Sequence, residues 1–158
     1  MSVKTGTVVL KWADGEYPFR LAKRELQELS RKIIRLLMVE HGVSEAIAVP
    51  LAFPWEIYRR VTSGNPIAGE VYEVIFQGLV GADMKPQEAV ALCKRYVDER
   101  PLLEYVPLAH AIMLEALVPP VGTTAKKKPA SEAAKANTNS VGSDSPKTAP
   151  PSDSVPAT

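Results

Sequence analysis

The chain has 158 residues, of which 46% are hydrophobic, and its 19 basic and 18 acidic side chains give a net charge of +1. That length accommodates one domain, and a near-neutral charge argues against nucleic-acid binding, which needs a clustered positive face. No apolar stretch reaches membrane-spanning length, and no secretory signal follows the first residues. We therefore expect no membrane partner, no nucleic-acid partner and a cytoplasmic location.

The first element that we expect is a β-hairpin. Alternating runs over 7–12 and 16–21 flank the pair Asp14-Gly15, which is a strong signal for a two-residue turn. If that pair forms the loop, residues whose numbers sum to 29 face each other, so that Trp12 lies opposite Tyr17. One face of the hairpin is then apolar. Because an isolated hairpin is marginally stable, this face should pack on helices.

Helical periodicity begins after the hairpin and runs from 23 to about 41, where Gly42 is placed to end the helix. The segment 43–52 is apolar and ambiguous, with a short helix as one interpretation. A further helix is predicted over 54–61, because proline is tolerated in a first helical turn.

Three more apolar-periodic segments fill 68–118, separated by breaks at 81–86 and 100–101. The first has one apolar stripe, with Glu70, Glu73 and Gln77 assigned to the solvated side. The third segment, 102–118, is apolar on almost every side, so a single neighbouring element cannot bury it. The sequence therefore predicts a mainly α fold, in which an N-terminal β-hairpin packs on a small bundle of about five helices.

The composition changes abruptly after 118. The segment 119–158 has no aromatic residue, no Leu and no Ile, and it contains five Lys and three acidic residues, which leaves 14 basic and 15 acidic residues for 1–118. Such a segment buries too little apolar surface to offset its ordering entropy. We predict a folded domain over 1–118 and a disordered tail over 119–158.

The residues that carry chemistry are few and scattered. His41 and His110 lie far apart and have no neighbouring ligand at metal-site spacing. The single cysteine, Cys93, excludes an internal disulfide and lies on the apolar face of its helix, where a buried structural thiol is expected. We therefore expect no enzyme, no catalytic residue, no metal and no cofactor.

Several blocks of sequence together resemble a known family. They are the run 71–81, then Met84, Pro86, Glu88 and Ala89, then the run 95–102, preceded near the start by 13–17 and 19–21. In this order they resemble the gene-transfer-agent and prophage family of small tail proteins, over roughly 1–122. That family is usually described as tail assembly chaperones encoded beside the tape-measure protein.

The resemblance implies a chaperone that binds the tape-measure protein during tail assembly in the cytoplasm of a bacterial host. The tail-tube protein is a second candidate partner, and self-association is a further option. A structural tail-tube or connector subunit is the alternative function. A tube subunit normally needs a substantial β-sheet, whereas one hairpin is the clear sheet signal here.

The nearly all-apolar segment 102–118 is the predicted client-binding element. The helix over 86–99 offers this segment only one apolar face, so part of the segment's circumference should remain at the surface. The alternative is that the hairpin covers the helix completely. The candidate partner-binding residues are Leu103, Val106, Ile112, Met113, Leu114 and Leu117, and Met113 suits an adaptable contact because its side chain is unbranched.

We expect the segment 119–158 to be dispensable for folding, because it lacks large apolar side chains to pack. A chain that ends at Gly122 should give the same thermal transition as the full chain. Failure of this truncated chain to fold would contradict the predicted domain boundary.

Overall fold

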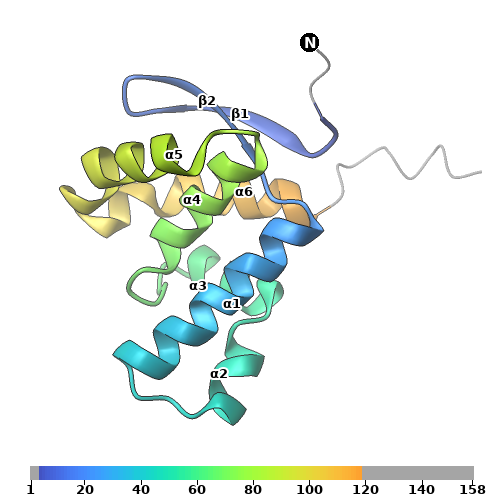
Figure 1. The fold of residues 1–158 in the computed structure, drawn as a ribbon, viewed down its shortest axis with the longest axis vertical. Coiled ribbons are helices and arrows are strands. Elements are labelled where there is room, and N and C mark those ends of the chain that lie inside the picture. The colour runs from blue at the N-terminus through green and yellow to red at the C-terminus, as the bar shows by residue number, and fades with distance from the viewer. Residues whose placement is uncertain (1–3, 119–158) are drawn as a thin grey trace, which may run out of the picture. The chain divides into compact units, whose positions relative to one another are not determined.

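The computed structural model describes residues 4–118, and Figure 1 shows their arrangement. A two-stranded antiparallel hairpin followed by six α-helices confirms the predicted mainly α fold. The predicted tail over 119–158 lies outside the described residues. In chain order the elements are β1 (Thr7–Trp12), β2 (Gly15–Arg20), α1 (Lys23–Glu40), α2 (Glu45–Leu51), α3 (Pro54–Thr62), α4 (Glu70–Gly81), α5 (Pro86–Cys93), a π-helical turn (Lys94–Asp98), a 3-10 turn (Leu102–Tyr105) and α6 (Val106–Leu117).

The hairpin forms where predicted, but its register differs by two residues. Trp12 pairs with Gly15 and Leu10 with Tyr17, so paired numbers sum to 27. The turn is Ala13-Asp14, with Ala13 at a φ of 55°. Because side chains alternate with a period of two, this shift leaves the apolar residues on the predicted face.

A hydrogen-bonded carboxylate supports this turn. The Asp14 carboxylate accepts hydrogen bonds from the Tyr17 hydroxyl at 2.6 Å and from the Tyr96 hydroxyl at 2.9 Å. The Tyr96 bond joins the hairpin turn to the π-helical turn that follows α5, and the Tyr17 bond lies within the hairpin. Together they lower the pKa of Asp14, with the Tyr17 bond as the larger cause.

The helices between residues 23 and 62 follow the predicted local signals. Gly42, at a φ of 62°, follows the end of α1, and Ser44 precedes the first turn of α2. Pro54 is in the first turn of α3. In Figure 1, α2 lies at the end of α1 that is far from the hairpin.

Helix α4 is enclosed by four elements, because β2, α1, α5 and α6 all contact it. Val71, Val74 and Ile75 are fully buried, as the apolar stripe predicts. The prediction that Glu70 and Gln77 face solvent is wrong, since both are buried. The reason for Glu70 is a distant partner: the Arg60 guanidinium binds its carboxylate, an ion pair that helical periodicity does not indicate.

Two glycines let α4 approach its neighbours closely. A Cβ on Gly78 would lie 3.2 Å from both Phe19 Cδ1 and Ile112 Cγ2. A Cβ on Gly81 would lie 2.0 Å from the backbone oxygen of Arg20. Both glycines therefore permit close packing. Neither one is the left-handed residue that ends the helix, because that residue is Asp83, at a φ of 72°.

The predicted helix over 102–118 is interrupted near its start. A 3-10 turn, Leu102–Tyr105, comes first, and α6 begins at Val106. Pro107 is in the first turn of α6, where its missing N–H leaves no hydrogen bond unmade.

We expect Gly81→Ala to destabilise the protein by about 1–3 kcal/mol, because the added methyl group collides with the rigid backbone of Arg20. Gly15→Ala is the matched control, since its nearest neighbour would be a Tyr17 ring atom at 3.6 Å. Urea unfolding of both variants measures the difference. Equal stability of the two variants would contradict a packing role for Gly81.

We expect Asp14→Asn to weaken the attachment of the hairpin turn, because an amide offers one acceptor oxygen in place of two. The pKa of Asp14 is lowered from 3.8 in the folded protein, so its stabilisation is complete above that value and is lost as pH falls through the folded pKa. The stability difference between wild type and Asp14→Asn should thus be constant near neutral pH and shrink below about pH 4. Urea unfolding across this pH range tests the expectation, and a difference that is independent of pH would contradict it.

Candidate docking surface

The structure divides the six residues predicted to bind a partner between the surface and the core. Ile112 and Met113 are buried, Val106 and Leu117 are half-buried, and Leu103 and Leu114 are 69% and 40% exposed. The expectation that Met113 remains at the surface is therefore wrong. A partner-binding role for the exposed members stays a prediction.

The burial of Met113 has a clear cause in the neighbours of α6. Helices α3 and α4 contact α6, and so do both strands of the hairpin. From the sequence, only the hairpin and the helix over 86–99 were expected to cover this segment. Helix α3 lies about fifty positions earlier in the chain, and its contact with α6 has no local signal.

A different apolar surface lies around the start of α3. Phe53 and Trp55 flank Pro54 and are 59% and 56% exposed. Two grooves share Phe53 and Pro54 in their walls, one of about 730 Å³ and one of about 660 Å³. We call the apolar walls of both grooves the Phe53 surface, which consists of Leu26, Leu51, Phe53, Trp55, Ala116 and Leu117.

Trp55 belongs to a stack of rings. The centroids of Trp55 and Tyr58 are 5.3 Å apart, and those of Tyr58 and His110 are 5.6 Å apart. The Tyr58 hydroxyl lies 3.4 Å from His110 Nε2. This stack connects α3 with α6 and restricts the orientation of Trp55, so that binding a partner requires less ordering of the side chain.

A buried ion pair holds the backbone beneath the Phe53 surface. Arg60 donates to both oxygens of Glu70 and, at 2.7 Å, to the backbone oxygen of Leu51 at the end of α2. Glu70 also accepts a hydrogen bond of 2.9 Å from the backbone N–H of Ile67. These bonds link α2, α3 and the start of α4, so the segment that carries Phe53 is anchored at both ends.

Charged side chains surround the apolar walls. Glu56 and Arg59 line the first groove and form an exposed ion pair of 2.6 Å, and Lys23 and Arg31 line the second. An apolar centre with a charged rim is the usual composition of a surface that binds another protein.

Local sequence signals predict the helix over 54–61, but the predicted partner-binding residues do not include Phe53 or Trp55. A signal for Trp55 was present. The buried stripe of α3 is Ile57 and Val61, which lie four residues apart. Trp55 is two residues before that stripe and therefore points to another side of the helix. For Phe53, which precedes the helix, we find no comparable signal.

The described residues offer little for catalysis. Burial raises the pKa of the Cys93 thiol to about 12, so the thiol is protonated and unreactive near neutral pH. Within 4–118, no group of three His, Cys, Asp or Glu side chains lies close enough to hold a metal ion. None of the helices in this part of the chain is both long and apolar enough to span a bilayer.

Comparison with known proteins gives one match. A family model described as phage tail tube protein, GTA-gp10, matches residues 5–118, a range that includes every helix and strand of the structure. Neither the curated proteins nor the solved structures give a match. The description is that of a structural tail protein, so it favours the tail-tube reading over the chaperone and does not name an enzyme. The chain therefore belongs to the phage tail tube (GTA-gp10) family and is a phage-like tail protein.

Proposed function

We propose that this tail protein is a tail assembly chaperone that holds a helical segment of the tape-measure protein on the Phe53 surface. The observation that carries the proposal is the pair of apolar grooves on either side of the exposed Phe53 side chain. Exposed aromatic side chains of this size seldom occur together without a partner, since burying them releases ordered water. Binding would take place in the host cytoplasm while the tail is built.

An amphipathic helix suits the geometry of this surface. Such a helix presents apolar side chains at intervals of three and four residues, and two of them can enter the grooves on either side of Phe53. Trp55 is the expected anchor, because tryptophan is enriched among residues whose truncation weakens binding most. The charged rim contributes orientation more than affinity.

The exposed candidate residues predicted from the sequence lie at the two ends of the segment 102–118. Leu117 belongs to the Phe53 surface, and Leu114 is exposed one turn before it. Leu103 precedes α6 and lies at the opposite end of this segment. The end of α6 near Leu117, rather than its middle, is thus the portion that we assign to partner binding.

The second candidate is a structural subunit of the tail tube, which the description of the family favours. A tube subunit remains in the finished particle in many copies, whereas a chaperone leaves before completion. Quantitative mass spectrometry of purified tail particles separates the two. Several copies of this chain per tail ring would overturn the chaperone proposal in favour of the tube subunit.

We expect Phe53→Glu to weaken binding of the tape-measure protein by more than tenfold, because a charge would be desolvated in the apolar interface. The stability of the variant should change by only about 0.5 kcal/mol, since the side chain is exposed. Titration calorimetry with purified tape-measure protein and thermal melts measure the two effects.

Val9→Glu is the matched control, because Val9 is 53% exposed on the outer face of the hairpin and lies outside both grooves. It should bind as wild type does. Met113→Glu should instead unfold the protein, at a cost on the order of 3 kcal/mol or more, because Met113 is buried. Unchanged binding by Phe53→Glu, or equal loss in both surface variants, would place the client elsewhere.

A further inference from the structure

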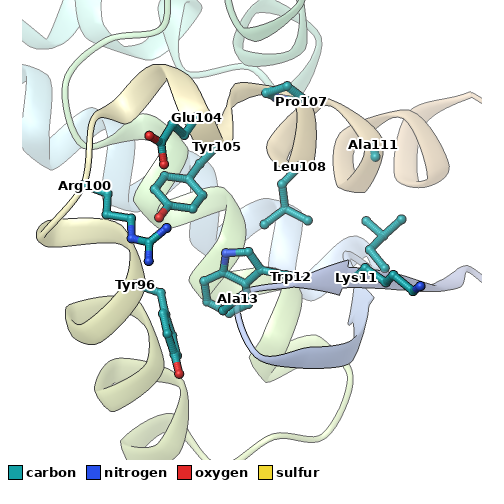
Figure 2. A pocket seen from close by; sticks show the side chains of 11 residues that line it. Lys11, Trp12, Ala13, Tyr96, Arg100, Glu104, Tyr105, Pro107, Leu108 and Ala111 are labelled. Atoms are coloured by element: carbon teal, nitrogen blue, oxygen red, sulfur yellow. The ribbon is translucent and has the colours of Figure 1, made fainter.

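A third hollow lies between the hairpin and the chain that leads into α6, and Figure 2 shows it from close by. It has a volume of about 460 Å³ and shares no lining residue with the Phe53 surface. Its walls combine apolar side chains with a few polar ones. Six of the lining residues are Trp12, Tyr96, Arg100, Glu104, Tyr105 and Leu108.

Trp12 presents an unusual feature in this hollow. Only 6% of the residue is exposed, and its indole nitrogen is buried without a hydrogen-bond acceptor among the residues of 4–118. A buried donor without an acceptor is costly and needs an explanation. Edge-to-face contacts with Tyr17, Phe19 and Tyr96, at centroid distances of 5.5, 6.0 and 5.9 Å, hold the indole ring in this orientation.

Arg100 supplies a positive charge beside this donor. Figure 2 shows its guanidinium group extending toward the hollow between the rings of Tyr96 and Tyr105. Within the described part of the chain, Arg100 takes part in none of the four ion pairs. Trp12 and Arg100 therefore line the same hollow, whose wall is apolar at Leu108.

We propose that this hollow binds a carboxylate carried on an apolar body and supplied by a polypeptide partner. One carboxylate oxygen accepts the indole N–H of Trp12, and the other accepts from the Arg100 guanidinium in a charge-assisted hydrogen bond. The apolar body packs against Leu108. The carboxylate is either a chain terminus or an Asp or Glu side chain, because both present the same two oxygens.

The charges at the hollow favour a carboxylate over a phosphate. The Arg100 guanidinium and the indole N–H match a single negative charge. The other two charged side chains of the wall, Lys11 and Glu104, have opposite signs and offset each other, so a second negative charge lacks a partner. The indole nitrogen is shielded from water, so a ligand must displace side chains to reach it. Arg100 and Glu104 are exposed, and exposed side chains change rotamer within nanoseconds.

The test follows the indole N–H signals of the full-length protein by ¹⁵N NMR. The chain has two tryptophans, and a Trp55→Phe variant assigns which of the two signals belongs to Trp12. The probes are acetyl-Leu-Glu-Leu-amide, which carries a side-chain carboxylate, and acetyl-Leu-Leu-Leu with a free terminal carboxylate. At least one of them should move the Trp12 signal downfield in a saturable manner and leave the Trp55 signal in place.

Variants then assign the charge contact. Arg100→Leu should weaken probe binding at least tenfold, Arg100→Lys should retain part of it, and the exposed Arg35→Leu on α1 should bind as wild type does. The more effective of the two probes identifies the carboxylate as terminal or side-chain. The signal that is measured belongs to Trp12, which lies outside the Phe53 surface. A negative result at Trp12 therefore leaves the chaperone proposal intact, and a failure of the chaperone proposal leaves carboxylate binding at Trp12 intact.

Three results would overturn the proposal. The first is the absence of a saturable Trp12 shift with either probe in the millimolar range. The second is an equal shift with the neutral control acetyl-Leu-Gln-Leu-amide or with inorganic phosphate. The third is unchanged probe affinity in Arg100→Leu, in a sample whose remaining amide signals match those of the wild type.

Discussion

The close approach of strand β2 to helix α4 is the constraint on which the rest of the structure depends. It exists because Gly81 has no side chain where the backbone oxygen of Arg20 lies, and because Gly78 leaves room for Phe19 and Ile112. The hairpin is thereby held against α4 and α6. This contact also carries Trp12 to the wall of the third hollow, so one packing requirement positions both the core and a candidate binding site.

The buried pair of Arg60 and Glu70 organises the other half of the molecule. Two charges removed from water contribute little net stability, but removal of either partner would leave the other uncompensated. The pair instead fixes the relative positions of chain segments, because Arg60 also donates a hydrogen bond to the backbone oxygen of Leu51. It connects three helices, and the short segment between α2 and α3 is left to project Phe53 outward.

The two candidate sites are suited to different kinds of contact. The Phe53 surface is broad, apolar and edged by charges of both signs, which fits the side of a helix. The hollow at Trp12 is smaller, and its walls combine the unpartnered indole donor with two basic side chains and one acidic side chain, a net charge of +1 that fits a single acidic group. A tail protein with both sites can recognise the body of a partner at one place and a specific charged group at another.

The types and approximate bounds of the elements were predictable from the sequence, because Gly42, Pro54 and Pro86 act on the backbone within a few residues. The apolar face of the hairpin was also predictable, because side chains alternate along a strand, whereas the pairing register was not. Tertiary structure alone decided that Glu70 and Met113 are buried and that Phe53 is exposed. Burial depends on which distant elements cover a residue, and the pairing of Arg60 with Glu70 or of α3 with α6 leaves no periodic trace in the local sequence.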